Sequence, residues 1–214
     1  MRKLILKMSI SLDGFVAGPN GETDWMIRSM SDEGKAWIVE ALGNVGLLAV
    51  GSRTFQAMAT YWPRSTDVLA PPMNQIPKAV FSRTGTNIEV ATTRALEDAR
   101  ARALPESKPD PQALEGWRSA RIVTGDLFDA ITRLKQEPGK DIVAFGGVEL
   151  AQNLASLGVI DEYRLVVHPV AVGKGLPLFS RLTAPVDLEL VELKAFKTGT
   201  VAHVYRARPT SRAA

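Results

Sequence analysis

The sequence predicts an α/β protein of three layers, α/β/α, whose central sheet is mixed, mostly parallel and ends in antiparallel strands. Short apolar segments alternate with helix-like segments up to about residue 157, as in repeated βαβ units. From residue 162 onward, three apolar segments follow one another without a helix between them, which indicates antiparallel strands. No repeat or linker interrupts this pattern, so we expect one domain over residues 1–205 and a basic, disordered tail over 206–214.

The first half of the chain opens with the apolar segment 4–8, which predicts a buried strand. After a turn-rich stretch, Ser31-Asp32-Glu33 is typical of a helix start, because acids there face the positive end of the helix dipole. That helix runs to about Leu42, and Gly43-Asn44 closes it. Further strands are expected at 45–50, 78–82 and 88–91, and further helices from 51–54 onward and over 94–104, with a surface loop after the latter as far as residue 117.

The second half of the chain continues the alternation of strands and helices and then ends in strands without helices between them. A strand at 120–124 precedes a helix over 127–136. A strand at 141–145 leads through Gly146-Gly147 into a helix that ends near Leu157. The last three strands are expected at 162–168, 187–195 and 200–206.

Composition excludes several classes of protein. The 214 residues include no cysteine and two histidines, which leaves no disulfide, no thiol nucleophile and too few ligands for an ordinary zinc enzyme. No apolar run approaches the roughly 18 residues of a membrane span. The basic N-terminus has its apolar stretch broken at Lys7, too early for a secretory signal, so we expect a cytoplasmic protein without a metal.

The charge balance does not indicate nucleic-acid binding. The chain has 26 Lys and Arg against 23 Asp and Glu, and three of the arginines lie in the tail 206–214, which has no acid. Without the tail, the body has 23 basic and 23 acidic residues and no long basic run. We therefore expect a small-molecule substrate, and neither a nucleic acid nor a membrane as partner.

Three strand ends carry residues suited to phosphate. Gly51, Arg53 and Thr54 open a helix after a strand, where backbone N–H groups and the helix dipole attract anions. Ser82-Arg83 follows the next strand, and a guanidinium binds a phosphate monoester with two hydrogen bonds. Gly146-Gly147 lets the backbone approach a pyrophosphate closely. The alternatives are an ordinary helix cap, a solvated loop arginine and a tight turn, respectively, and the third motif is not the GxGxxG fingerprint.

The acids and aromatic residues near the expected cleft have two readings each. Asp13 and Asp24 could hold the polar edge of a heterocycle or relay a proton. For Asp32 and Glu33 we prefer a charge at a helix N-terminus, and Asp32 is kept as a candidate substrate-binding residue beside Asp13. Trp25 either stacks on a ring or fills the core. We expect His168 to be structural, and we find no nucleophile partner for either histidine, which argues against a Ser-His-Asp hydrolase.

These motifs together resemble the dihydrofolate reductase-like superfamily, in particular the reductase domain of the bifunctional riboflavin-biosynthesis deaminase-reductase and its stand-alone relatives. The resemblance covers about residues 1–205. It rests on the segments MSISLDGFVA (8–17), GETDW (21–25), GSRTF (51–55), YWP (61–63), SR (82–83), FGG (145–147) and GKGLPLF (173–179).

The resemblance implies an NADPH-dependent reductase with the dihydrofolate reductase-like fold. Hydride passes from the nicotinamide to a small nitrogen heterocycle or a ribosylamino-pyrimidine, as in 5-amino-6-(5-phosphoribosylamino)uracil reductase. The residues that it implies for the cofactor are Ile10 and Trp25 beside the nicotinamide, Gly51, Arg53 and Thr54 at the pyrophosphate, Ser82 and Arg83 at the adenosine phosphate, and Gly146, Gly147, Val148 and Glu149 on the other side of the pyrophosphate. Asp13 lines the substrate side, and either Asp13 or water supplies the proton. Relatives also form homodimers, for which the C-terminal strands are the expected interface.

Two departures from the family concern the substrate. The riboflavin-pathway reductases have an arginine late in the helix before the second strand, whereas here the place is near Leu42 and the helix offers Lys35 and Glu40. Arg64 or Arg53 is the candidate replacement. Dihydrofolate reductase has an acid shortly after its Leu-Pro-Trp, whereas here the first acid after Trp25 is Asp32. The zinc-binding deaminase domain is absent from the sequence. The alternative functions are therefore a dihydrofolate or pterin reductase, or a non-catalytic nucleotide-binding module.

Overall fold

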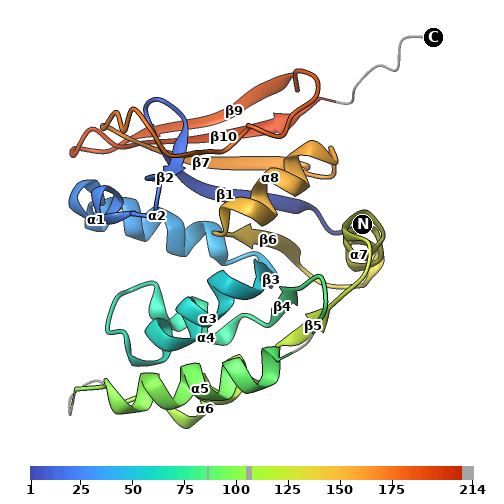
Figure 1. Cartoon of the computed structure of the whole chain (residues 1–214). Coiled ribbons are helices and arrows are strands. Elements are labelled where there is room, and N and C mark those ends of the chain that lie inside the picture. Colours follow the sequence, from blue (N-terminus) through green and yellow to red (C-terminus); the bar gives the residue numbers. More distant parts are fainter. Residues whose placement is uncertain (86, 105–107, 209–214) are drawn as a thin grey trace. The chain divides into compact units, whose positions relative to one another are not determined.

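The fold class is the one predicted, a mixed and mostly parallel sheet with helices. The computed structural model describes residues 1–85, 87–104 and 108–208 (Figure 1). Strands of the main sheet follow the order β5-β4-β3-β6-β1-β7-β10-β9, and β2 pairs with β8. The strands are β1 (Leu4–Ser11), β2 (Phe15–Ala17), β3 (Val45–Gly51), β4 (Lys78–Phe81), β5 (Arg121–Val123), β6 (Asp141–Phe145), β7 (Glu162–His168), β8 (Leu176–Pro177), β9 (Leu188–Ala195) and β10 (Val201–Ala207). The helices are α1 (Asp24–Ser29), α2 (Asp32–Leu42), α3 (Ser52–Tyr61), the 3-10 helix η1 (Trp62–Arg64), α4 (Ala70–Gln75), α5 (Ile88–Ala101), α6 (Pro111–Arg118), α7 (Leu127–Gln136) and α8 (Val148–Ser156).

The described residues divide into two compact units. Unit 1 comprises Met1, Lys3–Gly34 and residues 144–208, and unit 2 comprises Arg2 and Lys35–Val143. The boundaries fall inside α2 and β6, not in a linker. The expectation of a single domain over residues 1–205 stays a prediction.

Unit 1 is built on the strands β1, β7, β10 and β9. β1 pairs with β7 in parallel, with Ser11 opposite His168, and β10 lies antiparallel between β7 and β9. All residues of β1 are buried, because this strand lies in the interior of the sheet with a strand on either side. β10 runs to Ala207, and the Arg208 N–H donates to the Asp187 carbonyl, so the ordered chain extends beyond residue 205. The rest of the expected tail, 209–214, lies outside the described residues.

Unit 2 packs its helices around a parallel ladder of β3, β4 and β5. Its core contains Phe55 of α3, Leu96 of α5 and Trp117 of α6, each at most 1% exposed. The Phe55 and Trp117 rings lie 5.4 Å apart between centroids. Removal of such apolar surface from water is the main favourable contribution to the folding of a unit of this kind.

Two sequence predictions in unit 2 were wrong. Residues 88–91 form the first turn of α5 and not a strand, and α5 ends at Ala101. The buried positions Ile88, Thr92, Ala95, Leu96 and Ala99 follow helical spacing, so packing against the core outweighs the strand preference of Ile88 and Val90. The expected loop as far as residue 117 contains α6, which begins at Pro111 behind the capping residue Asp110. The β2, β8, α1, α4 and η1 elements were not predicted.

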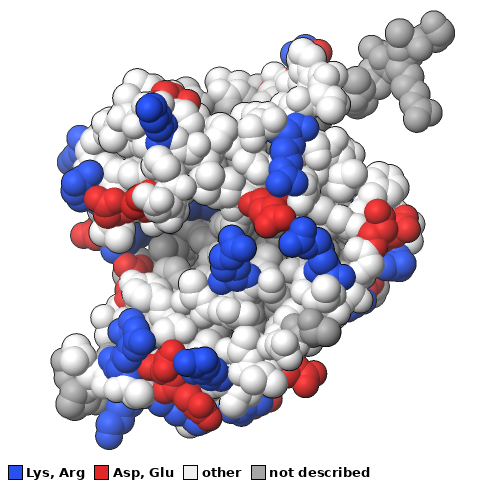
Figure 2. Space-filling model, viewed as in Figure 1, with Lys and Arg blue, Asp and Glu red and all other residues white. Residues whose placement is uncertain are grey.

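None of the helices in the described part of the chain combines the length and the hydropathy that a membrane crossing requires. Figure 2 shows lysine and arginine side chains interspersed with acidic ones on the viewed face. The cytoplasmic location stays a prediction.

Candidate functional site

The carboxyl ends of β3, β4 and β5 meet at one edge of unit 2. The parallel register sets Gly51 opposite Phe81, and Phe81 opposite Val123. The turns that follow these strands are therefore neighbours, with Gly51, Arg53 and Thr54 in one and Ser82 and Arg83 in the other.

The turn after β3 leads directly into α3 with its N-terminal N–H groups uncapped by a side chain. Gly51 is the N-cap residue of α3, and no side chain accepts a hydrogen bond from the first turn of this helix. In contrast, Asp110 accepts from the Gln112 N–H at the start of α6, and Asp126 accepts from the Asp129 N–H at the start of α7. The first turn of α3 thus keeps donors for an external anion, and it carries a base and no acid.

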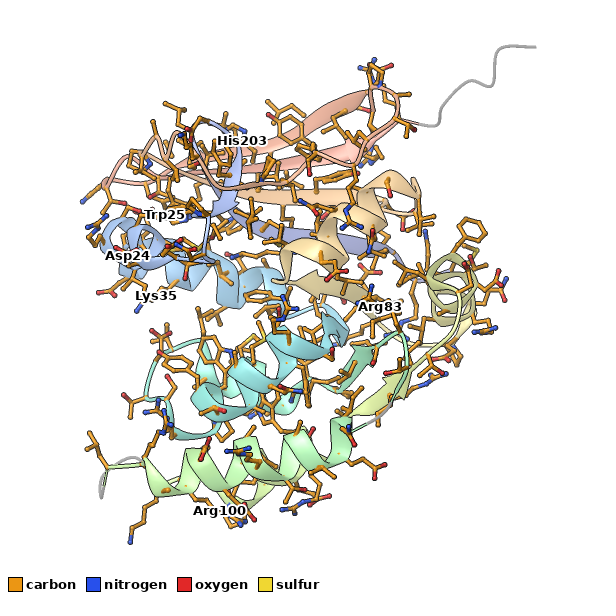
Figure 3. All side chains as sticks on the ribbon, viewed as in Figure 1. Asp24, Trp25, Lys35, Arg83, Arg100 and His203 are labelled. Carbon is orange, nitrogen blue, oxygen red and sulfur yellow. The ribbon has the colours of Figure 1, made fainter. Side chains whose placement is uncertain are left out.

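The turn after β4 is held in one tight conformation. The Ser82 N–H donates to the Val123 carbonyl at 3.0 Å, and Ser82 Oγ accepts from the Gly85 N–H at 3.1 Å. Gly85 has φ 69°, and a Cβ there would lie 2.8 Å from Thr124 Cγ2, so only glycine fits. Arg83 is exposed at this turn (Figure 3). Arg53 is exposed too and lines an open groove of about 470 Å³ between α3 and α5, with Arg94 and Asp98.

The candidate substrate cations of unit 2 have intramolecular partners. Arg64 lies in η1, where its Nε donates to the Thr60 carbonyl at 3.1 Å. Lys35 Nζ lies 2.6 Å from Asp67 Oδ2, a half-buried ion pair.

In unit 1, the turn after β6 contains two consecutive glycines with positive φ. Gly146 has φ 74° and Gly147 has φ 83°, a backbone that L-residues adopt at a cost. Gly147 is the N-cap residue of α8, and no side chain caps this helix either. Val148 and the exposed Glu149 form its first turn, as predicted, although the charge of Glu149 itself disfavours an anion there.

Asp13 ties the loop after β1 to the loop after β7. Its carboxylate accepts from Ser11 Oγ at 2.6 Å and from the Gly173 N–H at 2.7 Å, and the Val172 N–H adds a third donor. These hydrogen bonds, that of Ser11 foremost, lower the pKa of Asp13 to about 2. Asp13 is therefore a carboxylate at neutral pH, exposed at the surface of unit 1.

The remaining predicted residues of unit 1 lie in β1, α1 and α2. Ile10 is a buried residue of β1 opposite Val167. Trp25 is a buried residue of α1, 6% exposed (Figure 3). Asp32 is the exposed first residue of α2.

Sequence reasoning missed a polar cluster beside Trp25. His168, at the end of β7, is fully buried, and its ring packs edge-on against Trp25 with centroids 5.4 Å apart. Its Nδ1 lies 2.7 Å from Ser29 Oγ, a partner that the sequence does not predict for this histidine. No local sequence signal links these two residues, because they lie 139 positions apart.

Burial governs the protonation of this cluster. Burial, assisted by the positive charge of Lys7, lowers the pKa of His168 to about 4, so the imidazole is neutral at pH 7. Lys7 itself has its pKa lowered by burial to about 8, and its Nζ lies 4.8 Å from the centroid of the Phe145 ring. Among residues 1–85, 87–104 and 108–208 no group of acids and histidines could hold a metal ion.

The comparisons with known proteins agree with one another. The model of the RibD C-terminal domain family matches residues 2–202. The uncharacterized protein YyaP of Bacillus subtilis (strain 168) is 31% identical over 209 residues, which cover 95% of this chain and 94% of YyaP.

Solved structures share the fold at lower identity. A putative riboflavin biosynthesis protein from Shewanella sp. PV-4 has a TM-score of 0.69 at 20% identity, with 97% of this chain and 99% of the other covered. The diaminohydroxyphosphoribosylaminopyrimidine deaminase/5-amino-6-(5-phosphoribosylamino)uracil reductase from Thermotoga maritima has a TM-score of 0.63 at 18% identity, covering 97% of this chain and 57% of that one. Dihydrofolate reductase from Enterococcus faecalis, complexed with NADP(H) and RAB-propyl, has a TM-score of 0.55 at 12% identity, covering 97% of both chains.

Proposed function

Because the chain belongs to the RibD C-terminal domain family, we propose that it is an oxidoreductase that uses NADPH to reduce a small nitrogen heterocycle or a ribosylamino-pyrimidine. The bound nicotinamide would supply the hydride. The protein binds the cofactor and orients the acceptor beside it. The observation that carries the cofactor assignment is that α3 and α8 each follow a strand through a glycine N-cap residue, which leaves the first N–H groups of both helices without a side-chain cap.

The residues present fit a dinucleotide phosphate. In unit 2, the N–H groups at Gly51–Thr54 would hold the pyrophosphate, and Ser82 and Arg83 the phosphate on the adenosine ribose. In unit 1, Gly146, Gly147 and Val148 would supply further backbone donors. Ile10 and Trp25 would lie beside the nicotinamide. This donor set supports NADPH because glycine turns and a guanidinium satisfy phosphate oxygens without burying an unpaired charge.

Water is the better candidate for the proton donor. The two candidates were Asp13 and water. The pKa of Asp13, near 2, leaves no proton on its carboxyl group at pH 7, and its oxygens already accept hydrogen bonds from three groups. We propose that Asp13 positions the loop around Val172 and Gly173 on the substrate side, and that a water protonates the product.

Helix α2 offers no evident cation that would bind the phosphate of the family's phosphoribosyl substrate. Lys35 is paired with Asp67, and Arg64 with the Thr60 carbonyl. This supports a substrate without a ribose phosphate, such as a free pyrimidine or a pterin. A dihydrofolate or pterin reductase is therefore kept beside the riboflavin-pathway reductase as a proposal.

A non-catalytic nucleotide-binding module is the second candidate function, and the fully engaged Asp13 carboxylate favours it. Loss of reduced-nicotinamide absorbance with any pyrimidine, pterin or dihydrofolate would exclude it. NADPH binding without such oxidation across the whole panel would instead favour it over the reductase.

Arg83→Ala tests the adenosine phosphate assignment. We expect it to weaken NADPH binding by about 10- to 100-fold, the value of a charge-assisted hydrogen bond pair, and to leave NADH binding almost unchanged. Isothermal titration with both cofactors measures this. The control is Arg100→Ala, an exposed arginine in the last turn of α5, about 18 Å along that helix from its start (Figure 3). Equal losses for NADPH and NADH would assign Arg83 another role.

We also propose that the chain forms a homodimer through β9. This edge strand follows β10 at the end of the sheet order, and its Leu190, Val191 and Leu193 are 51%, 49% and 56% exposed. An exposed apolar edge strand is an aggregation hazard unless another chain covers it, and pairing with its own copy about a two-fold axis satisfies both edges.

Leu193→Lys is expected to raise the dimer dissociation constant at least about tenfold, because it brings a charge into the proposed apolar contact. Light scattering after size exclusion measures the mass across a dilution series. Val68→Lys, at a 58% exposed site in unit 2, is the control and is expected to leave the dimer intact. A wild-type chain that stays monomeric at every concentration contradicts the proposal.

A further inference from the structure

One face of β1 in unit 1 is polar although it is buried. Lys7, Ser9 and Ser11 alternate along the strand and therefore share one face, with exposed fractions of 7%, 9% and 0%. His168 is the register partner of Ser11 on β7, so its side chain belongs to the same face. Burial of polar groups costs free energy that apolar side chains would avoid, which makes this face a candidate for binding a polar ligand.

Two nitrogen atoms beside this face are buried without a partner. Trp25 Nε1 and His168 Nε2 have no hydrogen-bond partner anywhere in residues 1–85, 87–104 and 108–208. Their rings are in contact, edge to face, at 5.4 Å between centroids. An unsatisfied buried donor or acceptor costs about 1–3 kcal/mol, so two in contact are a feature that requires an explanation.

The hydrogen bonds of Ser29 determine which nitrogen of His168 carries the proton. Ser29 Oγ donates its one hydrogen to the Trp25 carbonyl at 3.0 Å. The contact of 2.7 Å between Ser29 Oγ and His168 Nδ1 then requires Nδ1–H as the donor. His168 Nε2 is consequently an acceptor, whereas Trp25 Nε1–H is a donor. The same direction of bonding leaves Ser29 without a base, so this pair is not a nucleophile.

We propose that Trp25 Nε1 and His168 Nε2 together bind the lactam edge of the substrate, an N–H beside a C=O in a pyrimidine or pterin ring. The indole N–H donates to the carbonyl oxygen, and the imidazole Nε2 accepts from the ring N–H. This proposal rests on the proposed reductase function and narrows it to lactam-bearing heterocycles. Because His168 is neutral at pH 7, it selects ligands with a hydrogen to donate and rejects N-alkylated rings.

Access to the pair requires a shift of α1, which carries both Trp25 and Ser29. This helix has six residues, Thr23 makes no side-chain cap hydrogen bond, and Ile27 is 78% exposed. Its C-terminal end is anchored, because Thr200 Oγ1 donates to the Ser29 carbonyl at 2.9 Å. A short helix held at one end opens at low cost in free energy, and Trp25 lies near its free end (Figure 3).

The test compares uracil with 1,3-dimethyluracil, which keeps both carbonyls and lacks both N–H donors. Each probe is titrated into the full chain without NADPH, and the indole ¹H–¹⁵N signal of Trp25, assigned with Trp25→Phe, is followed by NMR. We expect the wild type to bind uracil about tenfold more tightly than the dimethyl probe, the value of one hydrogen bond to a buried acceptor. His168→Leu is expected to abolish that preference. Trp25→Phe, followed through backbone amide signals because it lacks this indole, is expected to weaken the binding of both probes alike.

His203→Leu is the matched control. His203 is the other histidine of the chain, on β10, and its Nδ1 lies 2.9 Å from Tyr205 Oη. This variant is expected to keep the preference for uracil, and one-dimensional spectra show whether each variant is folded. The Nε2 nitrogen of His168 is expected to give a pyridine-type ¹⁵N shift in the free protein, a readout that needs no variant.

The proposal is overturned if uracil leaves the Trp25 indole signal unmoved, if both probes bind equally, or if His168→Leu keeps the preference. Unmoved signals in every titration would mean that ordered water alone satisfies the pair. A separate titration of NADPH distinguishes a failure of the proposed reductase function from a failure of the proposed lactam site at Trp25 and His168. Absent NADPH binding contradicts the proposed function, whereas the lactam titration tests the Trp25–His168 pair on its own.

Discussion

Gly147→Val is expected to weaken NADPH binding at least about 100-fold. Gly147 has φ 83° and follows Gly146 at φ 74°, and a β-branched residue does not adopt such a backbone without strain. The turn would change conformation, and the N–H groups at the start of α8 would turn away from the phosphates that we propose they hold. A branched side chain would also occupy the space that a glycine leaves for close approach of the ligand. Isothermal titration with NADPH measures the loss.

Gly158→Val separates this effect from backbone strain. Gly158 follows α8 in the same unit, has φ 64°, and a Cβ there meets no atom within 4 Å. Both variants should lose similar stability in urea, on the order of 1–2 kcal/mol. Only Gly147→Val is expected to lose NADPH affinity. A dissociation constant within twofold of the wild type would remove Gly147 from the cofactor site.

Lys78→Met is expected to raise the free energy of unfolding at pH 7 by about 2 kcal/mol. Lys78 is 2% exposed at the start of β4, with its Nζ 4.5 Å from the centroid of the Trp117 ring. Burial lowers the pKa of Lys78 to about 7. The unfolded chain, with a pKa near 10.5, therefore binds more protons than the native chain between about pH 7 and 10.5. Wild-type stability from this group consequently rises with pH across that window and is lowest at or below pH 7.

The methionine keeps the apolar stem and removes the charge, at the cost of the hydrogen bond from Nζ to the Asn74 carbonyl at 2.7 Å. Urea unfolding at pH 7 and pH 10 should show the advantage of the variant shrinking as pH rises, because Lys78 becomes neutral in both states. Lys108→Met, at an exposed lysine of the same unit, should change stability little at either pH. A variant that is less stable than the wild type at pH 7, or an advantage that is constant with pH, contradicts this account.

The sequence predicted the elements whose pattern is local. The helix 127–136 and the strands 141–145 and 162–168 have the predicted bounds. In α7, Asp126 caps the first turn, and Ala130, Ile131 and Leu134 form the buried stripe, so capping and periodicity agree. In α5 they conflict, because the β-branched start at Ile88 favours a strand, whereas burial against Phe55 and Trp117 requires a helix.

The candidate site likewise contains residues that local sequence predicts and residues that depend on the tertiary structure. Gly51, Ser82, Arg83 and Gly147 could be proposed from sequence because a turn between strand and helix is encoded by a few adjacent residues. The Trp25–His168 pair could not, since it depends on the register of β1 with β7 and on a partner 139 positions away. That Trp25 Nε1 and His168 Nε2 lack hydrogen-bond partners follows only from the three-dimensional positions of the groups around them.

The most direct test of the central claim is a titration of NADPH into the wild-type chain with tryptophan fluorescence as the signal. The chain has four tryptophans, and Trp25 is the one that we propose beside the nicotinamide. The proposed function predicts saturable quenching at submillimolar NADPH, with the saturation lost in Gly147→Val. Fluorescence that stays unquenched through that concentration range would contradict the assignment of this chain as an NADPH-dependent reductase.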